Sequence, residues 1–186
     1  MVMQGVDYRM NISKDKKILL HVCCAPCATA CVERLLADGR DVSLYFSNSN
    51  INSKMEFEKR LSYVEKIAGI FEVGLEVDPY QHDDWLEHIR GLENEAEKGL
   101  RCTKCFDWSL RRTARKAEDI GVACFATSLT VSPHKNSRVI FETGKQYSGF
   151  EPLDFKKENG FLRSRELSEK FNLYRQNYCG CEFSIR

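Results

Sequence analysis

Short apolar runs alternate along the chain with stretches in which apolar residues recur at helical spacing. The runs predict four buried strands and a fifth, shorter one: Lys17–Val22, Val42–Ser47, Phe71–Val77, Val122–Ser128 and Glu151–Phe155. Helical spacing, with Ser, Pro or Gly near several ends, predicts the helices between them: Pro26–Ala37, Lys54–Ala68, Asp83–Ile89, Cys102–Ile120, Ser132–Thr143 and Ser164–Phe171.

Strands that alternate with helices predict an α/β fold, with a parallel sheet covered by helices on both faces. We expect residues 1–186 to form one domain, with a flexible N-terminus at 1–16. An irregular C-terminal extension, 157–186, is expected to pack on the active-site crevice. Ligands of such sheets bind beyond the carboxyl ends of the strands. Two stretches that follow strand ends are therefore expected to share one crevice: Cys23–Cys27 and Ser128–Lys135.

Nine cysteines are the most informative feature of the composition. They are Cys23, Cys24, Cys27, Cys31, Cys102, Cys105, Cys124, Cys179 and Cys181. The N-terminal residues contain no apolar signal-peptide core, and no apolar run is long enough to span a bilayer, so we expect a cytoplasmic protein without a membrane partner. Thiols stay reduced in that compartment, and an odd number of clustered cysteines predicts metal or redox chemistry rather than a disulfide scaffold.

Four of these cysteines are candidate metal ligands that come from two predicted helix starts: Cys23, Cys24, Cys102 and Cys105. The positive end of a helix favours the thiolate, which is the form that binds metals. Four thiolates suit a [4Fe–4S] cluster or a structural zinc ion. The adjacent pair Cys23-Cys24 is a poor zinc knuckle, which favours iron–sulfur; thiols with no metal at all are the third interpretation. Cys27 is a further ligand or a neighbour of the ligands.

Cys179-Gly-Cys181 is a separate motif near the C-terminus. The two thiols are too close in sequence for an unstrained structural disulfide, although the glycine lets the backbone bend. A strained disulfide is easily reduced, so the motif predicts a redox-active pair. A flexible tail with two idle thiols is the competing interpretation.

The formal net charge of +1 does not by itself indicate a nucleic-acid partner. Six basic and three acidic residues lie between Phe155 and Arg175, however, and a phosphate-bearing partner would prefer this segment. The alternative is an ordinary solvated face. Lys135 is a candidate to hold a phosphate or another polar group. Asp107 follows Cys105 closely and is either near the metal or on a solvent-facing side of its helix.

Several longer motifs resemble the QueH family of epoxyqueuosine reductases. They are Leu20-His-Val-Cys-Cys-Ala-Pro-Cys27, Arg101-Cys-Thr-Lys-Cys105, Thr127-Ser-Leu-Thr-Val-Ser-Pro-His-Lys135, Arg163-Ser-Arg-Glu166 and Tyr174-Arg-Gln-Asn-Tyr-Cys-Gly-Cys181. The resemblance extends from Ile18 to Ser184 with the motifs in family order, which is far more specific than one Cys-x-x-Cys pair.

The resemblance implies an adenine-nucleotide α-hydrolase-like (HUP-like) fold and a cobalamin-independent oxidoreductase. It implies the final step of queuosine biosynthesis, reduction of epoxyqueuosine to queuosine in the anticodon loop of tRNA, with electrons from an unidentified donor. It further implies a [4Fe–4S] cluster on Cys23, Cys24, Cys102 and Cys105, a redox-active pair at Cys179 and Cys181, and an additional mononuclear iron with Cys27 and Asp107 as candidate ligands. The candidate substrate contacts are Lys135, Arg163 and Arg175.

Two other functions are compatible with parts of the sequence. A tRNA thiolation enzyme of the ATP-pyrophosphatase type would have the same sheet, but it needs a glycine-rich phosphate loop after the first strand. Here that position holds Cys-Cys-Ala-Pro-Cys, which offers no glycine nest for a pyrophosphate. A zinc-stabilised nucleic-acid-binding module without catalysis is the second alternative, and its metal would be zinc without sulfide.

Overall fold

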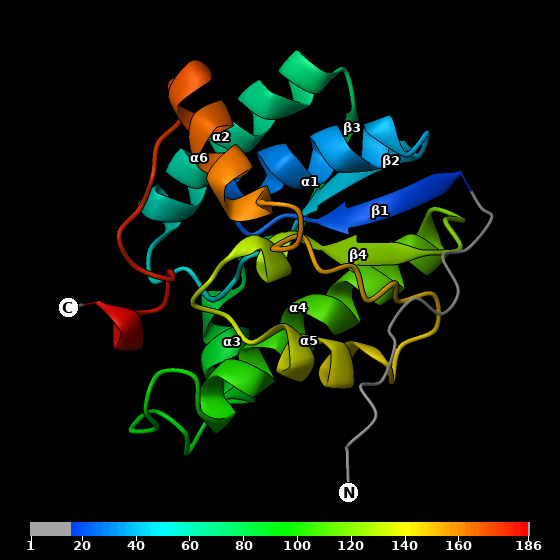
Figure 1. Ribbon diagram of the computed structural model, residues 1–186. Coiled ribbons are helices and arrows are strands. Elements are labelled where there is room, and N and C mark those ends of the chain that lie inside the picture. The colour runs from blue at the N-terminus through cyan, green and yellow to red at the C-terminus, as the bar shows by residue number, and fades with distance from the viewer. Residues whose placement is uncertain (1–15, 186) are drawn as a thin grey trace, which may run out of the picture.

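A four-stranded parallel sheet forms the centre of the protein. The structure, a computed structural model, describes residues 16–185, so the predicted flexible N-terminal segment lies outside the described residues except for its last one. The strands pair in the order β3-β2-β1-β4 (Figure 1). Their bounds are Lys17–His21 for β1, Asp41–Phe46 for β2, Gly74–Val77 for β3 and Phe125–Thr127 for β4.

Helices cover both faces of this sheet, which confirms the predicted α/β class (Figure 1). One layer contains α1 at Ala25–Ala37, α2 at Lys54–Phe71 and α6 at Gly160–Lys170. The other contains α3 at His82–His88, α4 at Leu100–Asp119 and α5 at Ser137–Gly144. Two short 3-10 helices follow β4 and the last cysteine: η1 at Ser128–Val131 and η2 at Glu182–Ser184.

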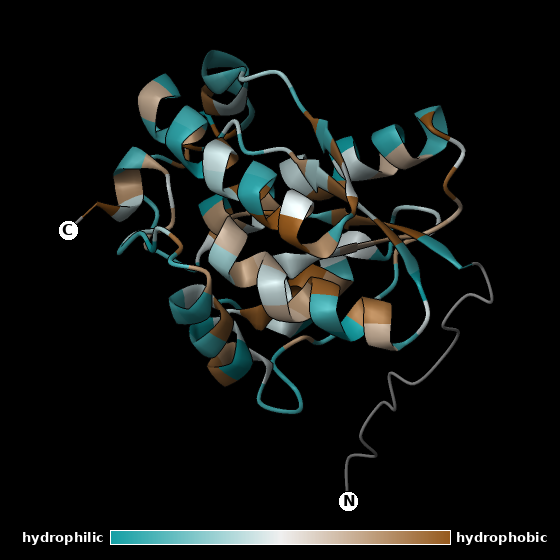
Figure 2. Cartoon of the chain, turned by 90° about the horizontal axis from the view of Figure 1, so that it is seen from above, coloured by the Kyte–Doolittle hydropathy of each residue, from teal (hydrophilic) through white to brown (hydrophobic). Residues whose placement is uncertain are grey.

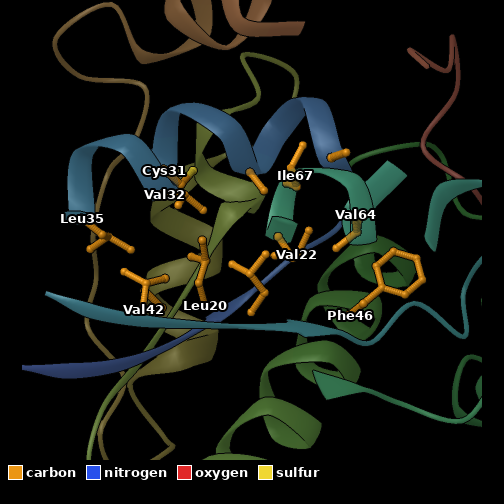
Figure 3. Packing of buried hydrophobic residues seen from close by; sticks show 14 of the residues in the cluster. Leu20, Val22, Cys31, Val32, Leu35, Val42, Phe46, Val64 and Ile67 are labelled. Carbon is orange, nitrogen blue, oxygen red and sulfur yellow. The ribbon is translucent and has the colours of Figure 1, made fainter. Parts of the chain in front are cut away.

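The alternation of side chains along β1 divides the core into two parts. Ile18 and Leu20 pack with the α1 and α2 side, whereas Leu19 packs with α4 and α5. Figure 3 shows the first part, where Val32 and Leu35 of α1 meet the sheet. The helices are banded in teal and brown in Figure 2, because each presents an apolar face to the sheet and a polar face to solvent.

Two of the nine cysteines lie in the core and do not line the cavity that the other cysteines approach. Cys31 is fully buried on α1, and Cys124 is buried just before β4. Cys124 donates to the Lys17 carbonyl (3.0 Å) and accepts from Arg40 (3.0 Å), at the amino edge of the sheet. Both are therefore packing cysteines.

The helix predicted to start at Ser132-Pro133 begins later, at Ser137. The side chain of Asn136 caps it by accepting from the Arg138 N–H (3.0 Å). Ser132 instead accepts from the His134 N–H (3.3 Å) in a local turn, so the residues from Ser132 to Asn136 form a loop and do not join the helix. This longer loop carries Lys135.

The predicted fifth strand, Glu151–Phe155, is wrong. Only an isolated parallel bridge pairs Phe125 with Phe150. Beyond it, the hydroxyl of Thr130 donates to the Leu153 carbonyl (2.8 Å) and accepts from the Phe155 N–H (3.3 Å), and these bonds take the place of a strand ladder. The strand predicted at Phe71–Val77 also shortens, because α2 continues through Phe71.

Among the described residues, no helix is both long enough and apolar enough to cross a bilayer.

Candidate metal centre

A cavity of about 440 Å³ opens at the carboxyl edge of the sheet. Its walls come from the loop between β1 and α1, the first turn of α4, the loop before α5, and the C-terminal segment. Six cysteines line it: Cys23, Cys24, Cys27, Cys102, Cys105 and Cys179. The crevice predicted from the strand-end rule is therefore present, and it is lined by more thiols than the four proposed as ligands.

Three sulfurs gather at the start of α1. Those of Cys23, Cys24 and Cys27 all lie within 4.8 Å of one another. Cys24 is the N-cap of α1 and Pro26 occupies its first turn, so the unpaired N–H groups of the helix surround these thiols. Such a site favours anionic sulfur and is suited to a metal ion.

The three thiols do not ionise equally. Hydrogen bonds to Cys24 from Cys23 and Cys27 hold the pKa of the Cys24 thiol well below its usual range. Hydrogen bonds with Cys23 and Cys24, together with burial, raise the pKa of the Cys27 thiol well above its usual range. Cys24 is therefore the first thiolate of the group. Ser128 supports the arrangement, because its hydroxyl accepts from the Cys23 N–H (3.1 Å) and donates toward the Cys23 sulfur (3.5 Å).

Cys102 and Cys105 lie on the first two turns of α4 and line the opposite wall of the cavity. The backbone N–H of Lys98 donates to the Cys102 sulfur (3.2 Å). Burial raises the pKa of Cys105 well above its usual range, so this thiol has a strong need for a cation when it ionises. Spacing by three residues lets both sulfurs point into the same space.

The two candidates for an additional iron lie in different places. Cys27 belongs to the three-sulfur group, whereas Asp107 is not among the residues that line the cavity. The Asp107 carboxylate accepts from Tyr147 (2.5 Å) and Gln146 (3.0 Å), and it lies 3.6 Å from the His88 ring. These contacts give Asp107 a structural part in joining α4 to the end of α5.

The C-terminal segment closes one side of the cavity, and Arg60 of α2 holds it there. Arg60 is 2% exposed, donates to the Cys179 carbonyl (3.0 Å) and pairs with Glu56 (2.7 Å). The Tyr178 ring lies over the Arg60 guanidinium at 5.1 Å. The tail is therefore tied to a helix that begins more than a hundred residues earlier.

The two thiols of the tail face different surroundings. Cys179 is exposed and lines the cavity, whereas Cys181 is buried beside Trp85 and Trp108. Both are free thiols. Gly180 between them has φ 140, and a Cβ there would approach the Asn50 amide nitrogen at 3.2 Å. Only glycine fits this position without strain.

The three predicted substrate contacts do not all lie at the cavity. Lys135 and Arg175 line the cavity. Arg163 does not; on the outer side of α6 it forms two hydrogen bonds of 2.8 Å with Glu33 of α1 and a third with Glu166. The guanidinium of Arg163 thus joins α6 to α1.

Several polar cavity residues were not among the predicted site residues, and His21 and Asn50 are two of them. His21, at the end of β1, is fully buried; its Nε2 donates to the Ser47 carbonyl (3.1 Å), so Nδ1 accepts from the Thr127 hydroxyl (2.9 Å) in the neutral ring. Burial lowers the pKa of His21, which favours that neutral form. Asn50 is 8% exposed in the loop after β2. Both follow from the strand-end rule, which applies to β2 as well as to β1 and β4.

The donor set fits a soft metal cofactor. Six of the residues that line the cavity are cysteines. Thiolate ligands suit zinc or an iron–sulfur cluster, whereas magnesium and calcium prefer oxygen ligands. The group of three sulfurs within 4.8 Å is close enough to bind a common metal centre.

Comparison with known proteins agrees with this chemistry. The family model described as Epoxyqueuosine reductase QueH matches residues 18–186. A protein named epoxyqueuosine reductase QueH from Streptococcus pyogenes is 42% identical over 181 residues, covering 91% of this chain and 70% of the relative. Proteins of the same name from Acinetobacter baylyi and Thermotoga maritima are 38% and 33% identical; they cover 91% and 90% of this chain, and 81% and 90% of their own lengths. The cysteine-lined α/β chain therefore belongs to the epoxyqueuosine reductase QueH family.

Proposed function

We propose that this oxidoreductase removes the epoxide oxygen of epoxyqueuosine in tRNA and leaves queuosine, in the cytoplasm and with electrons from a donor still to be identified. The observation that carries the proposal is the convergence of six thiols from three separate segments on one cavity. A binding module has no need for so many ionisable sulfurs around a space open to a ligand. A reductase needs them to hold a redox cofactor next to its substrate.

Four of these thiols are the proposed ligands of a [4Fe–4S] cluster: Cys23, Cys24, Cys102 and Cys105. When bound, the cluster would transfer electrons one at a time, and an additional iron would supply a Lewis acid for the epoxide oxygen. Cys27 is the proposed ligand of that iron because its sulfur lies beside those of Cys23 and Cys24. Asp107 has no part in this proposal, since its carboxylate is engaged by Tyr147 and Gln146.

The tail is the proposed immediate source of the two electrons and two protons, and the metal centre would pass the electrons to the substrate. Reduction of the epoxide breaks both C–O bonds, forms a carbon–carbon double bond and releases water, which consumes two electrons and two protons. Oxidation of the Cys179 and Cys181 thiols to a disulfide releases the same two electrons and two protons. The donor then reduces the disulfide. Gly180 gives the backbone the freedom that bringing the two sulfurs together requires.

The cavity also has to receive a nucleotide that lies in an RNA loop. A base in a single-stranded loop can leave its stack and enter a pocket, while the flanking phosphates bind basic groups at the rim. Arg175 is exposed at this rim and lines the cavity. Phe161, at the start of α6, lines the same mouth and offers a ring for stacking.

The proposed activity is tested by nucleoside analysis of tRNA from a strain that lacks its own epoxyqueuosine reductase. Anaerobic, metal-loaded protein with a strong reductant and no cobalamin is expected to convert epoxyqueuosine to queuosine. Cys24→Ser is expected to abolish conversion, whereas Cys124→Ser, at the opposite edge of the sheet, is expected to retain it. Fully loaded protein that leaves epoxyqueuosine unchanged, both in tRNA and as the free nucleoside, would contradict the proposal.

The redox role of the tail predicts a second result. Cys179→Ala and Cys181→Ala are each expected to keep the metal content of the wild type and to slow turnover by about tenfold or more, because either change removes the dithiol couple. The measurement is the rate of queuosine formation with the metal content determined on the same samples. Cys124→Ala is the matched control. A double variant at positions 179 and 181 that turns over at the wild-type rate with the same donor would show that the pair is idle.

The different positions of Arg175 and Arg163 predict different effects on tRNA binding. Arg175→Gln is expected to weaken binding and to reduce the slope of log affinity against log salt by about 1, as loss of one phosphate contact does. Arg163→Gln is expected to leave both unchanged and to lower the thermal unfolding midpoint slightly, because it removes a surface ion pair with Glu33. Equal weakening by the two variants would contradict this assignment.

A further inference from the structure

Lys135 is the cation most closely associated with the thiols of the cavity. It lines the cavity from the loop before α5, and it is only partly exposed. Burial lowers the pKa of the Lys135 ammonium, but the negative charge of Cys179, Cys23, Cys27 and Cys24 outweighs that effect and raises the pKa overall. Lys135 and these four cysteines line the same cavity, so its ammonium is placed to stabilise the thiolate of Cys24 first.

The backbone of Lys135 is held in place by its neighbours. The Lys156 ammonium donates to the carbonyl of Lys135 (2.9 Å) and to that of Ser132 (3.2 Å). The Lys135 N–H donates to the Ser132 carbonyl (3.3 Å), and Asn136 is committed to capping α5. These hydrogen bonds fix the backbone from which the Lys135 side chain reaches the cavity.

Of the other cations near the thiols, Arg101 is buried beside Cys102 at the start of α4, where it donates to the Glu93 and Glu95 carbonyls. The others are either neutralised or exposed. Arg60 approaches Cys24, but its charge is balanced by Glu56 at 2.7 Å. Lys98 and Arg175 line the cavity with exposed side chains, where water screens their charge. Among the described residues, no carboxylate forms an ion pair with Lys135. The one carboxylate among the residues that line the cavity is that of Glu97, which is exposed to solvent.

We propose that Lys135 is the counter-charge of the cysteine site and raises the reduction potential of the cofactor that the thiolates hold. The inference rests on the proposed function, because it requires a redox cofactor on these cysteines. An added electron makes such a centre more negative, and a fixed positive charge nearby stabilises the reduced form. Lys135 thus acts on the cofactor through its charge, whereas Arg175 at the rim binds phosphate.

The test is a reduction potential, measured by spectroscopic titration of anaerobically reconstituted protein without RNA. Lys135→Met removes the charge at similar length and is expected to lower the potential, so that the equilibrium constant for one-electron reduction falls by about tenfold, equivalent to about 59 mV. Lys135→Arg is expected to keep the potential near the wild-type value. Lys157→Met, an exposed lysine outside the cavity lining, is the matched control and is expected to change nothing.

Iron content is determined on every sample, and binding of tRNA is measured in parallel. If Lys135→Met and Lys135→Gln both lose iron while Lys135→Arg retains it, the charge is required even to assemble the centre, which supports the proposal. An unchanged potential in Lys135→Met, with weaker and less salt-dependent tRNA binding, would make Lys135 a phosphate ligand and overturn it. Because the titration needs no substrate, a protein that fails to reduce epoxyqueuosine can still give either result.

Discussion

A single buried imidazole connects the three strand ends from which the site is built. His21 ends β1, donates to the Ser47 carbonyl just past β2, and accepts from Thr127 at the end of β4. Parallel pairing sets these residues side by side, with His21 opposite Thr127 in the register. The loops that follow begin from fixed positions, so Cys23 meets Ser128 at 3.1 Å. Without this common edge, the thiols of the first loop would have no defined relation to the loop that carries Lys135.

The site is completed by segments that the sheet does not position. The first turn of α4 brings Cys102 and Cys105 from the other helical layer, and the tail brings Cys179 from the end of the chain. Arg60 holds the tail through its carbonyl and stays paired with Glu56, so a buried charge orders the backbone without adding net charge near the sulfurs. The result is a cavity whose walls are fixed separately and whose most exposed thiol is that of Cys179.

Local sequence patterns were sufficient for much of this architecture. The apolar run of β1 and the proline at the start of α1 set those elements almost to the residue, and the strand-end rule placed Cys23 and Lys135 at one cavity. Contacts between distant residues left no such pattern. Arg60 meets Cys179 across 119 positions, and Arg163 meets Glu33 across 130. Basic residues in a polar segment look alike in sequence, so the pairing of Arg163 with Glu33 and the exposure of Arg175 were visible only in the structure. Thr130 likewise ended a predicted strand through side-chain bonds to a segment more than twenty residues away.

The most direct test of this account is the metal and sulfide content of anaerobically purified protein, with its absorbance. One cluster on Cys23, Cys24, Cys102 and Cys105 predicts brown protein with about four iron and about four acid-labile sulfide per chain. Serine at Cys24 or Cys105 should remove the colour, and serine at the core residue Cys31 should not. Stoichiometric zinc without sulfide, in protein purified without exposure to oxygen, would contradict the account and indicate a zinc-stabilised protein instead.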